Sequence, residues 1–69
     1  MKENDFGKNL QYLRKEKGLS QKELGTIFNV CNQTISAWER GSAEPDIKTL
    51  IAFSCFFKIS LDCLLGKED

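Results

Sequence analysis

Residues 20–41 carry the signals of two short helices separated by a turn, and this pattern constrains the fold more than any other. Ser20 followed by Glu23 is a capping box, in which the two side chains satisfy amide groups at a helix start. Asn29 tolerates the left-handed conformation that ends such a helix. Gly41 suits the end of the second helix for the same reason. The stretch therefore predicts a helix, a tight turn and a second helix.

Elsewhere apolar residues recur at helical spacing, and no segment alternates as a strand does. Phe6, Leu10 and Leu13 form one stripe, and Pro45 suits the first turn of a later helix. The expected fold class is all-α, a compact domain of five helices. A domain this small should bury most of its large apolar side chains or share them with a partner subunit. We expect one domain over residues 1–69, with helices at about 5–17, 21–28, 32–40, 46–57 and 61–65.

Two of the predicted helices are recognised by their apolar residues. In the second helix, Leu24, Ile27 and Phe28 form an apolar face only two turns long. Beside them, Gly25 is small, which lets the backbones of the second and third helices approach closely at their crossing. The fourth helix is marked by Ile47, Leu50, Ile51, Phe53 and Phe57.

Composition argues against several classes of function. The chain has 69 residues with ten basic and ten acidic side chains, so its net charge gives no support for nucleic-acid binding. Such binding depends, however, on how charge is distributed over the faces. No apolar run approaches the roughly 20 residues that span a bilayer, so no membrane association is expected. Enzymatic activity and a small-molecule ligand are not expected either, because there is no histidine, no nucleophile–base pair and no glycine-rich phosphate loop.

The cysteines indicate a reducing environment. Cys31, Cys55 and Cys63 are odd in number and lack CxxC spacing, which argues against a disulfide framework. Without histidine a zinc site is not expected, and no metal or cofactor is predicted. Reduced thiols fit a cytoplasmic protein. Cys31 precedes the third helix as a poor cap; the alternative is a redox-sensing thiol at a helix N-terminus.

Four parts of the sequence form a specific combination. They are L-S-Q-K-E-L at 19–24, V-C-N-Q-T-I-S-A-W-E-R-G at 30–41, Pro45, and I-S-L-D-C-L-L-G at 59–66. Together with the first helix, they resemble nearly the whole domain of the Cro/XRE-type, or phage-repressor-like, helix-turn-helix transcriptional regulators. The resemblance implies a sequence-specific regulator of transcription, a repressor that binds double-stranded DNA. It would read a pseudo-palindromic operator as a homodimer, through the helix that starts near Asn32.

Base contacts are expected from the exposed face of the third helix. Ile35 and Trp38 face inward, so the residues beside them face outward. The Gln33 amide can donate and accept together, which matches adenine N6 and N7, and the matching position in phage repressors contacts bases. For each candidate the alternative is a solvated side chain, and Thr34 and Ser36 could instead bond phosphate. The candidates are Asn32, Gln33, Thr34, Ser36 and Ala37.

Phosphate contacts are expected from Gln21, Lys22 and Arg40. Gln21 starts a helix, where amide groups and the helix dipole favour an anion, and the resemblance implies that it clamps the DNA backbone. Arg40 could instead stabilise the C-terminus of its own helix. The resemblance also implies a partly buried ion pair between Arg14 and Glu39, which ties the first helix to the third.

An apolar surface near the end of the chain predicts a homodimer interface. If Phe53 and Phe57 face the core, Phe56 turns toward another face. The alternative is that Phe56 packs under the fifth helix. The predicted interface comprises Ala52, Cys55, Phe56 and Cys63.

A second class of function stays open, a protein-interaction module or antitoxin-like subunit with weak or no DNA binding. The neutral net charge favours it, and so do Glu44 and Asp46, whose carboxylates would repel phosphate. The polar residues of the predicted contact helices, among them Gln21, Asn32 and Gln33, oppose it.

Overall fold

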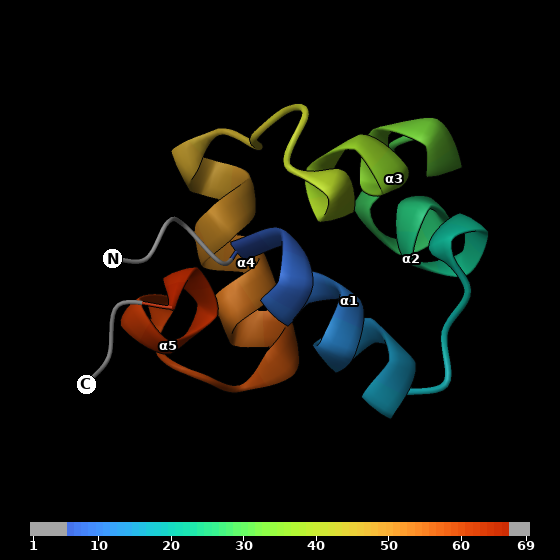
Figure 1. Ribbon diagram of the computed structural model, residues 1–69. Helices are drawn as coiled ribbons and strands as arrows, with labels where there is room; N and C mark the ends of the chain where they lie inside the picture. Colours follow the sequence, from blue (N-terminus) through green and yellow to red (C-terminus); the bar gives the residue numbers. More distant parts are fainter. Residues whose placement is uncertain (1–5, 67–69) are drawn as a thin grey trace.

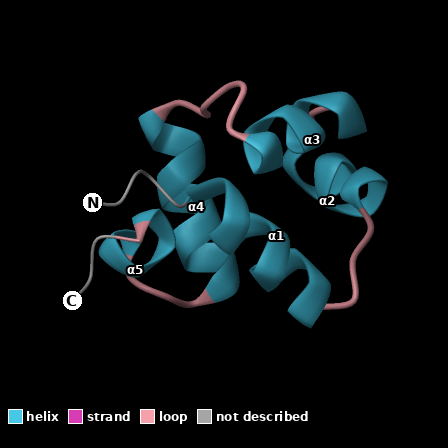
Figure 2. Cartoon of the chain, viewed as in Figure 1, coloured by secondary structure: helices cyan, strands magenta, loops and turns pink. Residues whose placement is uncertain are grey.

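The computed structural model describes residues 6–66, and this part of the chain is built from helices joined by short loops, without a strand (Figures 1 and 2). The helices are α1 (Phe6–Glu16), α2 (Gln21–Phe28), α3 (Asn32–Arg40), α4 (Ile47–Phe57) and α5 (Leu61–Leu65). In Figure 1, α1 crosses in front of α4, with α2 and α3 to one side and α5 to the other. The prediction of an all-α, five-helix fold is confirmed. The predicted start of the first helix, at residue 5, lies outside the described residues.

The ends of α2 and α3 follow the local signals in the sequence. The Glu23 amide donates to Ser20 Oγ over 3.0 Å, and the Ser20 amide donates to Glu23 Oε1 over 2.8 Å, which confirms the capping box. Asn29 (φ 61°) and Gly41 (φ 81°) end the two helices in the left-handed conformation. The turn between α2 and α3 is therefore fixed by residues that favour it locally.

The start of α4 differs from the prediction by one residue. Asp46 is the N-cap, and its carboxylate accepts a hydrogen bond of 3.1 Å from the Thr49 amide. Pro45 is buried one position before the cap, so it is not in the first turn of the helix. Asp46, and not Pro45, sets the start of the helix because Asp is among the best N-cap residues. Proline at the first helical position makes no such capping hydrogen bond. Hydrogen bonding to the Thr49 side chain, followed by this bond from the Thr49 amide, lowers the pKa of Asp46.

The core is centred on the fully buried Phe53 of α4. Its ring lies 4.3 Å from that of Phe28, 5.7 Å from that of Trp38 and 6.2 Å from that of Phe6, measured between centroids. Aromatic pairs at these separations add to the stabilisation that burial provides. The buried apolar residues come from every helix and are Phe6, Leu10, Leu24, Ile35, Trp38, Phe53, Phe57 and Leu64.

Three isoleucines that the sequence placed in apolar helix faces are exposed. The exposed fraction is 51% for Ile27, 60% for Ile47 and 48% for Ile51. Each residue turns an α-helix by about 100°, so positions two apart lie on nearly opposite sides. Gly25 and Phe53 are buried, which turns Ile27 and Ile51 outward. The identity of the buried face is decided by packing between helices, which apolar spacing alone does not specify.

None of the helices in residues 6–66 combines the length and the apolar character that a membrane span requires.

Candidate nucleic-acid interface

A close backbone approach at Gly25 sets the arrangement of α2 and α3. The Val30 amide donates to the Gly25 carbonyl oxygen over 2.8 Å. A Cβ at position 25 would lie 2.6 Å from the Val30 carbonyl oxygen, well inside contact distance. The expected close approach is therefore present, although the atoms nearest to Gly25 belong to the turn and to the first residue of α3. Only glycine fits here without a shift of the backbone.

The outward face of α3 combines exposed amides with smaller, partly covered side chains. Asn32 and Gln33 are exposed, and Thr34, Ser36 and Ala37 are half-buried. Ile35 and Trp38 are buried, as predicted. The structure thus brings the five candidate base-contact residues together on one short helix at the periphery of the molecule (Figure 1).

A hydrogen bond holds the Arg40 side chain against α3. Arg40 Nη1 donates to Ser36 Oγ over 2.7 Å, one turn back along the helix. The guanidinium has five N–H donors, so four of them are not used in this bond. Arg40 is exposed, and the Ser36 hydroxyl, which accepts this bond, can still donate one. The two residues together present donors of the kind that contact phosphate oxygens.

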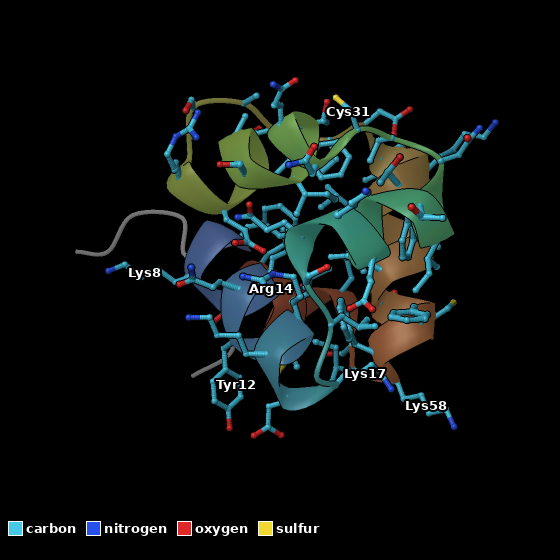
Figure 3. All side chains as sticks on the ribbon, turned by 90° about the vertical axis from the view of Figure 1, so that its right-hand side faces the viewer. Lys8, Tyr12, Arg14, Lys17, Cys31 and Lys58 are labelled. Carbon is cyan, nitrogen blue, oxygen red and sulfur yellow. The ribbon has the colours of Figure 1, made fainter. Side chains whose placement is uncertain are left out.

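Cys31 caps α3 poorly, as predicted, because its side chain accepts no hydrogen bond that closes the helix start. The thiol instead lies 3.3 Å from Thr34 Oγ1. This contact with the Thr34 hydroxyl, followed by the amides of the first helical turn, lowers the pKa of the Cys31 thiol. In Figure 3 the side chain projects from the outer surface of the molecule. The thiol is exposed, at the start of the helix that carries the candidate base contacts.

A buried ionic network joins the three N-terminal helices. Arg14 Nε donates to Glu39 Oε2 over 2.7 Å and Arg14 Nη2 donates to Glu39 Oε1 over 3.2 Å. The remaining Nη1 of Arg14 donates to the Leu19 carbonyl oxygen over 2.8 Å. Figure 3 shows Arg14 inside the molecule, whereas Lys8 and Tyr12 of the same helix extend into solvent. The network gives α3 a fixed position relative to α1.

Gln21, predicted to contact phosphate, takes part in the same network. Its amide nitrogen donates to Glu39 Oε1 over 2.9 Å, and the residue is half-buried. One amide hydrogen and the carbonyl oxygen of its side chain are not used in this bond. Lys22, the next residue, is exposed. Sequence reasoning missed this hydrogen bond, since no local pattern links a residue of α2 to one of α3.

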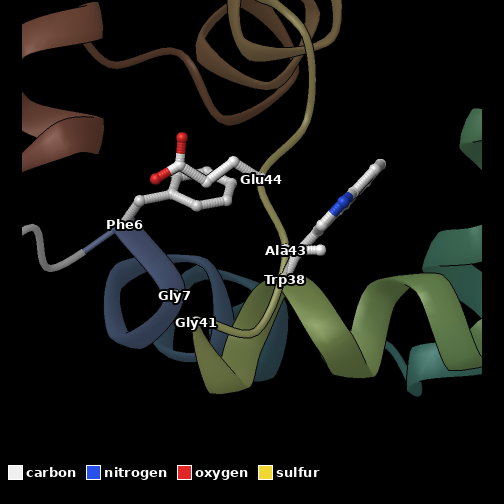
Figure 4. Close-up of a pocket in the computed structure, with 6 residues that line it drawn as sticks. All are labelled: Phe6, Gly7, Trp38, Gly41, Ala43 and Glu44. Carbon is white, nitrogen blue, oxygen red and sulfur yellow. The ribbon is translucent and has the colours of Figure 1, made fainter.

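A shallow pocket lies where α1 begins and α3 ends (Figure 4). Its wall includes the Phe6 and Trp38 rings, and Glu44 is its one charged group. At Gly7 an added Cβ would lie 2.5 Å from the Glu39 carbonyl oxygen. This role of Gly7 was not predicted from the sequence, although a glycine inside a helical pattern often marks such a packing contact. The full lining is Phe6, Gly7, Trp38, Gly41, Ala43 and Glu44.

The pocket offers little chemistry for a cofactor, because no lining residue except Glu44 has a charged side chain. No group of three or more metal-ligating side chains occurs within residues 6–66. Residues 41–44, which follow α3, are exposed, and Glu44 is among them. The chemistry of the region is therefore that of a hydrogen-bonding surface.

The predicted dimer surface is only partly open. Ala52, Cys55 and Cys63 are exposed, but Phe56 is half-buried. The Phe56 ring lies edge-on to that of Phe28, with centroids 5.4 Å apart, and Lys17 Nζ lies 5.3 Å from its centroid. Phe56 thus packs against α2 and is covered by Lys17. The sequence had suggested either a dimer interface or packing under the fifth helix, and neither prediction included this contact.

The geometry agrees with what comparison to known proteins shows. A helix-turn-helix family model matches residues 10–62. The transcriptional regulator ImmR of Bacillus subtilis is 38% identical over 64 residues, which are 93% of this chain and 50% of that protein. The chain therefore spans half the length of this relative.

Two solved structures have the same fold. A transcriptional regulator from Listeria innocua aligns with a TM-score of 0.90 and 32% identity, over 99% of this chain and 64% of that one. The c2 repressor of Salmonella phage P22, crystallised with a synthetic operator, aligns with a TM-score of 0.81 and 35% identity, over 91% of this chain and 96% of that one. The family match covers most of the chain and includes α2, the turn and α3. This chain belongs to the Cro/XRE-type family of helix-turn-helix transcriptional regulators.

Proposed function

We propose that the protein is a sequence-specific repressor that binds a pseudo-palindromic operator as a dimer, with α3 in the major groove. The observation that carries this proposal is the exposed pair Asn32 and Gln33 at the start of a helix held in place by Glu39. Side-chain amides of this kind form bidentate hydrogen bonds with adenine. A recognition helix contacts base edges mainly through its N-terminal residues, which is where both amides lie.

Three further residues suit contacts with the DNA backbone. Lys22 is exposed at the start of α2, Arg40 keeps four free donors, and Gln21 keeps one amide hydrogen. Such contacts fix the register of a protein on the duplex, while base contacts provide specificity. The P22 c2 repressor, similar in fold, was crystallised on its operator, which supports the same mode of binding here.

Selection from a random duplex library would test this function. The protein should enrich an inverted repeat whose half-sites lie about one helical turn apart, because a two-fold dimer presents two copies of α3. A Gln33→Ala variant should enrich the same repeat poorly or lose a preferred base within each half-site. Absence of any enriched sequence, with the wild type and Gln33→Ala indistinguishable, would contradict the proposal.

The competing candidate is a protein-interaction module that retains the fold without groove binding. The exposed Glu44, in the loop after α3, favours it, because its carboxylate repels phosphate. Under this alternative the library selection fails, although the protein is folded. A Glu44→Gln variant tests the effect of this carboxylate: its affinity for DNA should rise if the loop approaches phosphate and stay the same if it does not.

A further inference from the structure

The outward face of α4 is mainly apolar, with Lys48 as its one charged residue. Ile47, Ile51 and Cys55 follow at intervals of four residues and are all exposed, as is Ala52 beside them. The solvent-facing side of a surface helix is normally polar. On α1 the corresponding side carries exposed Lys8, Gln11 and Lys15, so the contrast lies within one molecule. A row of exposed branched side chains marks a surface that another molecule covers.

The two ends of this face carry opposite charges. Glu44 and Asp46 precede α4, and Lys58 follows it; all three are exposed. Figure 3 shows Lys58 extending from the lower end of α4 into solvent. Asp46 is the N-cap of α4 and Lys58 is its C-cap, so one charged residue lies at each end of the helix. The face is therefore complementary in charge to the same face of a second copy whose α4 runs in the opposite direction.

We propose that this face binds the same face of a second copy, with the two α4 helices antiparallel and Ile51 on the two-fold axis. Each Ile47 then faces Cys55 of the other copy, and the Asp46 end of each helix lies beside Lys58 of the other copy. A two-fold interface of this kind uses the same surface on both subunits. The antiparallel arrangement also sets opposite ends of the two helix dipoles side by side.

The charges disfavour the parallel arrangement and favour a second copy over an unrelated partner. In a parallel pair, Asp46, Lys48 and Lys58 would each approach the same residue of the other copy, and like charges repel. In the antiparallel pair, Lys48 approaches no residue of its own sign. Each copy carries an acidic residue at one end of α4 and a basic residue at the other. A second copy therefore supplies every opposite charge that this face requires, without another kind of protein.

This contact specifies the interface of the dimer that the proposed function requires. Its biological role rests on that proposed function, but the contact itself does not. It retains Ala52 and Cys55 from the predicted dimer surface and leaves out Phe56, which packs against Phe28. Self-association is measured without DNA. Failure of the α4 contact and failure of operator binding are therefore separate results.

Sedimentation equilibrium of two matched variants tests the contact. Ile51→Glu places two carboxylates at the two-fold axis, and Ile27→Glu makes the same change on α2 at nearly equal exposure, 51% against 48%. Both variants should remain folded, which circular dichroism verifies. The dissociation constant of the dimer should rise at least tenfold for Ile51→Glu and stay unchanged for Ile27→Glu. A wild type that stays monomeric at millimolar concentration, or equal effects of the two variants, would overturn the proposal.

Disulfide trapping tests the direction of the helices. In a Cys31→Ser/Cys63→Ser background, Ile47→Cys should give a covalent dimer through Cys55 of the other copy. The background itself should not, because antiparallel pairing sets the two Cys55 residues about 12 Å apart along the axis, beyond the reach of a disulfide. Ile27→Cys in the same background controls for random collisions. Rapid dimerisation through Cys55 alone, or equal trapping by Ile27→Cys, would contradict the antiparallel contact.

Discussion

Arg14 and Glu39 form a bidentate ion pair that is almost completely withdrawn from solvent, with 9% of the arginine side chain and 3% of the glutamate side chain exposed. Glu39 also accepts the amide of Gln21, so one carboxylate connects α1, α2 and α3. In the described residues, every buried side-chain nitrogen and oxygen has a hydrogen-bond partner. The position of α3, the candidate recognition helix, therefore depends on one of its own residues, whose side chain is buried.

Removal of Glu39 should destabilise the domain severely. Glu39→Ala leaves the Arg14 charge buried without a partner, which costs about 3–5 kcal/mol. Urea unfolding measures the loss. The double variant Arg14→Met/Glu39→Leu is the control, since replacing both charges by apolar groups of similar volume is often nearly neutral. If Glu39→Ala and the double variant have equal free energies of unfolding, the unpaired buried charge of Arg14 is not the cause of the destabilisation.

Alanine at Gly25 or Gly7 should destabilise the domain, contrary to the usual effect in a helix. Replacing a helical glycine by alanine normally stabilises by roughly 0.5–1 kcal/mol. Here the new Cβ would lie 2.6 Å from the Val30 carbonyl oxygen or 2.5 Å from that of Glu39. We expect a loss of about 1–3 kcal/mol in thermal or urea unfolding. Lys8→Ala, at an exposed neighbour of Gly7, should change stability little; a stabilised Gly7→Ala would refute the close approach.

The Cys31 thiol should react with iodoacetamide at lower pH than an ordinary thiol. Its pKa is lowered by the Thr34 hydroxyl and the amides of the first turn of α3, so the reactive thiolate forms earlier as pH rises. The pH–rate profile of a Cys55→Ser/Cys63→Ser variant measures this. Adding Thr34→Val should move the midpoint to higher pH, and urea should move it further. An unchanged midpoint in Thr34→Val would exclude the hydroxyl as the cause.

Arg40 should contribute to DNA affinity without contributing to sequence preference. If its guanidinium contacts phosphate, Arg40→Ala weakens binding to all duplexes alike and reduces the salt slope by about one. Fluorescence anisotropy at several salt concentrations measures both quantities. Lys48→Ala removes a charge of the same sign from α4 and should leave the slope unchanged. A selective loss on one sequence would instead assign Arg40 to base readout.

Local sequence signals predicted both ends of α2 and the end of α3. The capping box at Ser20 and the left-handed residues Asn29 and Gly41 act within a few residues of themselves, so they can be recognised without knowledge of the tertiary structure. At the start of α4 the sequence offers two local signals, a first-turn proline at Pro45 and a capping carboxylate at Asp46. The helix begins after Asp46, whose carboxylate caps it.

Features that depend on contacts between distant residues were harder to predict. The exposure of Ile27 and Ile51 follows from the rotation of α2 and α4, which Gly25 and Phe53 set through packing. The hydrogen bond from Gln21 to Glu39 joins two helices, and no local sequence pattern in either helix indicates it. The pair of Arg14 and Glu39 was predicted only because the sequence resembles a known family, since neither residue stands in a pattern of its own.

Gln33 is the side chain that we propose reads a base in the operator. The most direct test compares wild type and Gln33→Ala, by fluorescence anisotropy at fixed salt, on the selected operator and on a shuffled duplex. We predict that Gln33→Ala loses about 1–3 kcal/mol on the operator, tenfold in affinity for each 1.4 kcal/mol, and almost nothing on the shuffled duplex. An equal loss on both duplexes, or none on either, would contradict the assignment of α3 as the reading helix.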